Sequence, residues 1–237
     1  MAQDNYEIQV YASPTMAKGS TMVELHSNFV FNGEKNTIDG VYPTHHLLHE
    51  TVEITHGWTD WFETGFYFFN SIGDAGRTAY VGSHIRPRVM APTKWHWPVG
   101  ASLSMEVGYQ SPKFDPDDWT LEIRPIVDKQ LNKFYLALNP TFDKSLHGLN
   151  KNQGYIFSPN FKGSYNFTKI IAGGVEYYGS LGPLNHFFPY QQQGQQLFAA
   201  VDLEWSPDWE VNFGYGWGLT QSTDKSIFKL ILGYRFH

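Results

Sequence analysis

Hydrophobic and polar residues alternate one by one over most of the chain. In residues 49–70, Val52 and Ile54 alternate with Thr51 and Glu53, and a second alternating run follows a short turn. A period of two residues indicates a β-strand with two different faces. This stretch therefore predicts a β-hairpin whose apolar faces are bulky and aromatic and whose polar faces carry carboxylates.

The same alternation recurs along the chain and predicts twelve strands. They are expected at residues 21–32, 49–55, 62–70, 80–90, 100–110, 119–128, 134–142, 155–165, 170–180, 195–205, 210–218 and 226–237. Most have the roughly 9 to 11 residues that a tilted strand needs to cross a bilayer, and short turns alternate with longer loops. We expect an all-β fold, a transmembrane antiparallel up-and-down β-barrel of about 12 strands, over residues 21–237.

The N-terminal residues 1–20 do not fit this count. An extended stretch at residues 6–14 would be a thirteenth strand, and an odd number would place the two termini on opposite sides of the membrane. We expect residues 1–20 to be a periplasmic segment, with two alternatives left open: a plug inserted in the lumen, or a tail. The start MAQDNY reads like a mature N-terminus at Ala2 behind an added methionine, so we expect a secretion signal to have been removed.

Tryptophan is concentrated at the expected short-turn end. One interfacial girdle is predicted there, from Trp58, Trp61, Trp95, Trp97, Trp205 and Trp209. The other is predicted from Tyr109, Trp119, Phe142, Tyr155, Tyr177 and Trp217. A soluble β-sandwich or lectin-like barrel would also alternate, but the charged opposite faces and the segregated tryptophans favour a membrane barrel. We expect a monomer in the bacterial outer membrane, with lipopolysaccharide and phospholipid as partners.

Composition excludes several other classes of protein. Aromatic and charged residues each make up 17% of the chain, and no apolar run approaches the length of a membrane helix. The net charge of −6 and the lack of a basic patch argue against nucleic acid as a partner. The sequence contains no cysteine, which removes disulfides, thiolate catalysis and cysteine-based zinc sites.

The polar strand faces supply the candidate functional residues. The predicted pore-lining set is Glu24, His26, Glu53, Glu63, His84, Arg86, Arg88, Glu106, Glu122, Arg124, Lys162, Glu176, Asp202, Lys229 and Arg235. Charges that face a small lumen need partners or water. Two interpretations stay open and are compatible: an ion-pair network that fills and stiffens the barrel, and a polar constriction that selects solutes.

Histidines and an apolar loop were weighed as further sites. His45, His46 and His49 lie at a loop and a strand start without the helical spacing of a zinc site, so we expect no metal and no cofactor. The late loop at residues 181–194 is unusually apolar. Its side chains are expected either to fold inward as a lid or to pack on the rim, and they are Leu184, His186, Phe187, Phe188 and Tyr190.

One charged residue breaks the alternation. If Val52 and Ile54 face lipid, Glu50 should face lipid too, which is costly for a charge near mid-bilayer. Two explanations are available. A β-bulge near His49 could turn Glu50 inward, or the strand could border a lateral opening in the wall.

A barrel enzyme, such as an outer-membrane phospholipase, is the rival function. It needs a serine and a histidine on one face for proton transfer. His26 directly precedes Ser27, and Ser83 directly precedes His84, so each pair is expected to point to opposite faces. We therefore expect no enzymatic activity. A structural or adhesive barrel without transport remains an alternative.

Four segments carry a resemblance to a known family. They are HETVEITHGWTDWFETGF, LEIRPIVDKQLNKFYLALNPTF, GGVEYYGSLGP and GWGLTQSTDKSIFKLILGYRF. In their order they resemble outer-membrane proteins labelled, from gene context, as involved in the meta-pathway of phenol degradation. The resemblance implies a narrow twelve-stranded channel for uptake of small molecules, including hydrophobic or aromatic compounds. The chain departs from the pattern by ending in His237 after the last aromatic residue.

Overall fold

The computed structural model describes residues 5–73 and 78–237. The expected mature N-terminus at Ala2 and residues 74–77 of a polar loop lie outside the described residues. The strands are β1 (Thr21–Asn32), β2 (Leu48–Thr59), β3 (Phe62–Ile72), β4 (Thr78–Met90), β5 (Gly100–Gln110), β6 (Trp119–Leu131), β7 (Phe134–His147), β8 (Ile156–Asn166), β9 (Ile171–Ser180), β10 (Gly182–Pro183), β11 (Gly194–Leu203), β12 (Trp209–Gly218) and β13 (Ser226–Phe236).

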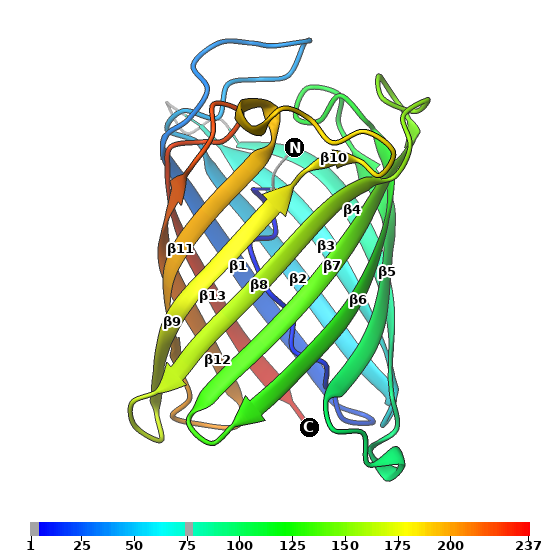
Figure 1. Cartoon of the computed structure of the whole chain (residues 1–237), viewed down its shortest axis with the longest axis vertical. Coiled ribbons are helices and arrows are strands. Elements are labelled where there is room, and N and C mark those ends of the chain that lie inside the picture. Colours follow the sequence, from blue (N-terminus) through cyan, green and yellow to red (C-terminus); the bar gives the residue numbers. More distant parts are fainter. Residues whose placement is uncertain (1–4, 74–77) are drawn as a thin grey trace.

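Twelve of these strands form a closed antiparallel barrel (Figure 1). Each long strand pairs with the next long strand along the chain, and β1 pairs with β13, so the sheet has no free edge. The very short β10 is added beside β8. The predicted twelve-stranded up-and-down barrel is confirmed. Among the residues described, no helix is long and apolar enough to cross a bilayer.

The two faces of the wall differ as the alternation predicts. In β3, Phe66 and Phe68 are each 42% exposed on the outside, whereas Tyr67 and Phe69 are buried inside the barrel. Successive side chains of a strand point to opposite faces, so the bulky residues cover the outer surface and the charged residues line the interior. The outer surface is therefore apolar around the barrel.

Turns and loops occupy opposite ends of the barrel (Figure 1). At the short-turn end, where the C-terminus also lies, all six tryptophans of the first predicted girdle are exposed. A 3-10 turn at Thr93–Trp95 separates β4 from β5 there, and another at Tyr190–Gln192 lies in the long loop before β11. Trp119 and Trp217 of the second predicted girdle are exposed as well, so both predicted aromatic sets contribute tryptophans to the outer surface.

Some predicted boundaries are wrong. The strand β7 continues to His147, five residues into a stretch expected to be a loop, because Asp143 and Lys144 pair with Glu122 and Leu121 of β6. The unexpected β10 arises because β9 pairs with β8 only from Asn160 onward, which leaves the upper part of β8 to pair with the following loop. Both differences come from cross-strand pairing rather than from local pattern.

Residues 5–20 run through the inside of the barrel and contain no strand (Figure 1). Ile8 and Val10 are buried in one apolar cluster with wall residues of five strands, including Tyr178 and Phe198. At the loop end, Tyr6 joins a second cluster with Phe69. The apolar core of this protein therefore lies between its N-terminal segment and the barrel wall.

The segment leaves the lumen through a tight junction beside β2. Gly19, at a φ of 81°, donates a hydrogen bond to the carbonyl of Gly57 at 2.7 Å, and Gly57 donates to the carbonyl of Ser20 at 3.0 Å. A Cβ on Gly57 would collide with the backbone of Met16 and Ala17. Glycine at position 57 thus permits the close approach that connects the segment to β1.

The cost of placing Glu50 on the outer face is reduced in a way that neither expected explanation gives. The register of β2 runs without a shift from Leu48 to Gly57, so no bulge lies at His49. Both neighbouring strands, β1 and β3, pair with β2 at this point, so the wall has no opening there. His49 is buried inside the barrel, and Glu50 stays on the outer face, where it accepts a hydrogen bond from Ser27 Oγ at 2.9 Å. A cross-strand hydroxyl partner explains the tolerated charge.

Candidate functional site

The lumen gathers all of the side chains that the alternation assigns to it. Ten of the fifteen are buried: Glu24, His26, Glu53, Glu63, Arg86, Arg88, Glu106, Arg124, Glu176 and Lys229. The other five are partly buried: His84, Glu122, Lys162, Asp202 and Arg235. Arg235 is not part of the ion-pair networks described below. Its guanidinium donates to the carbonyl of Pro207 in a turn. His84 pairs with Glu106 at 2.6 Å, and most of the other charges form three networks.

The first network joins β2, β3 and β4. Arg86 donates to Glu53 at 2.6 Å and lies 3.5 Å from Glu63, while Arg88 contacts Glu63 at 2.8 Å. Gly65, which faces Arg86 in the register, has no side chain, and a Cβ there would lie 3.1 Å from Arg86 Nη2. The guanidinium can therefore cross β3 to reach Glu53. Buried pairs of this kind depend on each partner, because removing one leaves an uncompensated charge.

The second network ties the N-terminal segment to β6. Arg124 contacts Glu7 at 3.0 Å and Glu122 at 2.7 Å, and the hydroxyl of Tyr11 donates to Glu7 at 2.5 Å. The ring of Tyr11 lies between two guanidinium groups, each 4.7 Å from its centroid, from Arg86 and Arg124. Cations over an aromatic face are attracted to the ring, more strongly where water is excluded. Tyr11 thereby links the first network to the second.

The third network closes the opposite side of the lumen. Lys162 contacts Glu176 at 3.2 Å and Asp202 at 2.7 Å. Lys229 is fully buried, pairs with Glu176, and donates to the backbone carbonyl of Ile8 at 3.2 Å. The charges of β8, β9, β11 and β13 are therefore linked to the N-terminal segment through Lys229.

Wall side chains hold the backbone of this segment. Asn139 exchanges two hydrogen bonds with the backbone of Tyr11, at 2.7 and 3.0 Å. Asp128 accepts from the amide and hydroxyl of Ser13, and Arg88 donates to the carbonyls of Ala12 and Pro14. A buried coil must have its backbone polar groups satisfied, and here the wall provides side chains for that purpose.

A cavity of about 370 Å³ opens at the loop end of the lumen. We call it the vestibule. Six carboxylates and two cationic side chains line it: Glu7, Glu106, Asp115, Asp117, Glu122 and Asp143 with Arg124 and Lys144. Phe69 and Phe188 supply an apolar contribution. Like charges around a cleft produce a field that attracts the opposite charge, so the vestibule favours cations.

The apolar loop contributes one residue to this cavity. Phe188 lines the vestibule and is half-buried, whereas Leu184, His186, Phe187 and Tyr190 are exposed. The ring of Phe187 stacks on Phe157 of β8 at 6.3 Å. The structure therefore separates the five residues between the cavity and the rim.

Two serines lie close to histidines, the residues that a hydrolytic site would need. Ser145 donates to Asp117 and to the backbone carbonyl of His147, not to its ring. Ser20 Oγ lies 3.3 Å from His237 Nδ1, and His237 Nε2 lies 2.9 Å from Asp208, at the short-turn rim. Ser20 is only 5% exposed. A nucleophile must reach its substrate, and this hydroxyl is enclosed.

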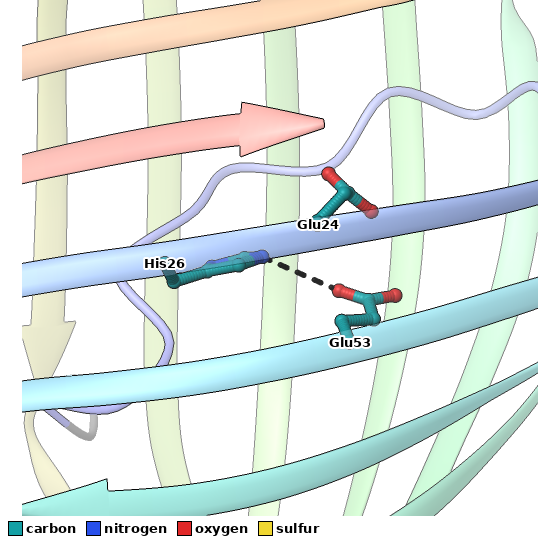
Figure 2. Close-up of side chains that lie close together, drawn as sticks. All are labelled: Glu24, His26 and Glu53. Carbon is teal, nitrogen blue, oxygen red and sulfur yellow. Dashed lines mark ion pairs between the residues drawn. The ribbon is translucent and has the colours of Figure 1, made fainter. Parts of the chain in front are cut away.

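Histidines take positions that the sequence did not resolve. His45 and His46 stack on each other at 4.0 Å in a loop, and His49 meets the ring of Tyr6 edge-on at 4.7 Å. In contrast, Glu24, His26 and Glu53 come together in the wall (Figure 2).

Several lumen residues escaped the sequence reasoning, among them Asp143, which lies in a stretch expected to be a loop. Glu210 shares its inward face with Asn212 on β12, so strict alternation would have found it. Glu7 and Tyr11 belong to a segment without a strand, and no periodic signal marks them. Their role depends on where the segment lies.

Comparisons with known proteins support the fold. No family model matches the sequence, and no curated protein does. The solved KdgM porin matches with a TM-score of 0.59 and 10% identity, covering 91% of this chain and 99% of that chain. The NanC porin matches with a TM-score of 0.59 and 7% identity over the same shares. A KdgM porin in complex with disordered oligogalacturonate gives a TM-score of 0.58 at 10% identity, with the same coverage. The chain has the barrel fold of outer-membrane porins.

Proposed function

We propose that this chain is an outer-membrane channel for passive uptake of small molecules, closed by residues 5–20 and opened when that segment moves. The observation that carries the proposal is a closed barrel with a charged interior that holds a coil instead of a solid apolar core. The barrel acts as a monomer, with its apolar outer face against lipopolysaccharide and phospholipid. No enzymatic step is assigned to it.

The nature of the closing contacts supports movement of the segment. Residues 5–18 are held by side-chain hydrogen bonds and ion pairs, and backbone pairing with the wall begins only at Gly19, beside Gly57. Each such contact is individually modest, and water entering the lumen can replace it. A segment joined to the sheet by a full ladder of backbone hydrogen bonds would be far harder to displace.

The vestibule supports a solute with a positive charge. Carboxylates outnumber cations around it, and Phe69 and Phe188 offer apolar contact. One fold relative is described in complex with an oligogalacturonate, which carries negative charge. The family resemblance of the four sequence segments points to hydrophobic or aromatic compounds. We propose that the solute is a small cation with an apolar or aromatic part.

The test combines conductance and flux for the full-length protein. In planar bilayers under a KCl gradient, we expect open events with a cation-selective reversal potential. The double variant E106Q/D143N should shift that potential towards zero, because it removes two vestibule charges. E204Q, at an exposed turn of the other end, should not.

Liposome swelling then separates the solute classes. An aromatic amine should enter faster than a neutral aromatic compound of equal size, and a uronic acid should enter slowest. Anion selectivity would overturn the proposed solute class alone.

A structural or adhesive barrel is the second candidate, and the filled lumen favours it. Absence of conductance and flux, even after removal of residues 2–16, would reject the channel and leave this second function.

A further inference from the structure

A cluster of metal-ligating side chains lies in the lumen wall, outside the vestibule. Glu24 and His26 are two residues apart on β1 and so share one face, and Glu53 of β2 lies directly opposite Glu24 in the register. Figure 2 shows the three side chains converging from the two strands. One ligand atom of each lies within 4.8 Å of the others, and His26 Nε2 is 3.5 Å from Glu53 Oε2.

These side chains are enclosed and retain unused polar atoms. Glu24 is 7% exposed, His26 0% and Glu53 1%. Among the described residues, Glu24 Oε1, Glu53 Oε2 and both ring nitrogens of His26 lack a hydrogen-bond partner. Burial of unpaired polar groups is costly. These atoms belong to groups that ligate metals, and they come from three adjacent side chains. In a neutral imidazole one ring nitrogen carries the proton and the other offers its lone pair to a metal.

The carboxylates around this cluster also outnumber the cationic side chains, which favours binding of a cation. Glu53, Glu24, Gly233 and Glu210 face one another in a row across β2, β1, β13 and β12. Directly opposed like charges destabilise a strand pair. Arg86 binds the far oxygen of Glu53. Within the described part of the chain, neither Glu24 nor Glu210 has a cationic side chain at ion-pair distance. The row therefore carries more negative than positive charge.

The sequence keeps space for the cluster. A Cβ at Gly233 would lie 2.8 Å from Glu24 Cγ and 3.4 Å from Glu210 Cβ. A larger residue at position 233 would push the Glu24 side chain away. On the lumen side, Gln9 of the N-terminal segment lies 3.4 Å from Glu210. The carboxylates are thus enclosed between the wall and the segment that fills the lumen.

We propose that Glu24, His26 and Glu53 bind one divalent transition-metal ion, of which zinc is the probe. An imidazole with two carboxylates suits zinc and its neighbours better than calcium or magnesium, which prefer all-oxygen sites. With ligand bonds of about 2.1 Å in tetrahedral geometry, two ligand atoms on one zinc ion lie roughly 3.4 Å apart. The distance between His26 and Glu53 is already close to that spacing. The site does not depend on the proposed transport.

Metal titration of the full-length barrel tests this site. After treatment with a chelator, the protein is titrated with Zn²⁺ and with Co²⁺, whose visible absorption reports nitrogen and oxygen ligands. We expect saturable binding of one equivalent that Mg²⁺ and Ca²⁺ do not displace. Glu24→Gln and His26→Gln should each weaken affinity at least about 100-fold, because even outer-shell substitutions cost about 10- to 100-fold. His147→Gln, at an exposed histidine that ends β7, should leave binding unchanged.

Two results would overturn the site: no saturable binding by the unaltered protein, or unchanged affinity in both glutamine variants. Folding of each variant is checked by the heat-dependent shift of barrels on gels. If a variant does not fold, anomalous diffraction at the zinc edge from crystals of the unaltered protein decides. A peak between the three side chains supports the site, and a peak elsewhere or no peak rejects it.

Discussion

Charged side chains point into the lumen at both ends of the barrel, but they are enclosed at one end and border an open cavity at the other. Near the short turns, Arg86 and Arg88 are buried in ion pairs and against residues 5–20. Near the loops, Glu122 and Asp143 border an open cavity of about 370 Å³. All four residues lie on the inner face of strands in which polar and apolar side chains alternate.

The difference lies in what occupies the lumen. At the short-turn end, Tyr11, Ala12 and Pro14 lie against the guanidinium groups and exclude water. At the loop end, the segment reaches the vestibule wall through Glu7 and leaves the remaining space open. Inward charge therefore makes either a sealed network or a wet cavity, depending on a segment that is not part of the wall.

The largest effect is expected from fixing the segment to the wall. An ideal Cβ on Gly100 would lie 3.2 Å from Ser13 Cβ, slightly closer than the roughly 3.5 to 4.5 Å found in disulfides. It would also collide with Asp128 Oδ1, so the Asp128 side chain must move aside to admit the cross-link. The chain contains no cysteine, so the pair S13C/G100C can be oxidised without competing thiols. We expect oxidation to abolish conductance and reduction to restore it.

The single variants S13C and G100C serve as controls, and oxidant should not change their conductance. Equal conductance of the oxidised and reduced double variant, with the cross-link verified by mass spectrometry, would show that the segment need not move.

A matched pair of substitutions sharpens the contrast between sealed and open ends. Arg86→Gln leaves Glu53 buried without its cation, so we expect a loss of about 3 to 5 kcal/mol in the free energy of unfolding. Asp143→Asn, at the half-buried vestibule wall, should cost about 1 kcal/mol or less, because its partner is the Ser158 hydroxyl. Urea unfolding in lipid vesicles measures both. Equal losses would mean that the two ends do not differ in burial energetics.

The last contrast concerns the ring and the hydroxyl of Tyr11. Tyr11→Phe keeps the ring beside Arg86 and Arg124 and loses the hydroxyl contacts with Glu7 and Tyr67, so a loss of about 1.5 to 3 kcal/mol in the free energy of unfolding is expected, the range for a hydrogen bond to a charged group. Tyr11→Leu also loses both cation–π contacts, each worth up to about 2 kcal/mol when desolvated. The same unfolding assay compares them. If Leu and Phe were equivalent, the ring would contribute only its volume.

Most of the wall was predictable because the face to which a strand side chain points is a local property. Glu53 and Arg86 were assigned to the inner face from their neighbours alone, and the structure buries both there. The extent of β7 could not be read in this way, since Asp143 extends the strand by pairing with Glu122. The environment of Glu50 could not be read from local pattern either, because its hydrogen-bond partner is Ser27 on the neighbouring strand.

The sequence by itself determined the twelve-stranded barrel and the side of the wall on which most of the strand charges lie, since a period of two needs only adjacent residues. Tertiary structure alone decided which inward charges meet and what lies between them. The placement of Tyr11 between Arg86 and Arg124, and the convergence of Glu24 with Glu53, depend on strand register and barrel closure. These bring together residues far apart in the chain, and no local periodicity records such contacts.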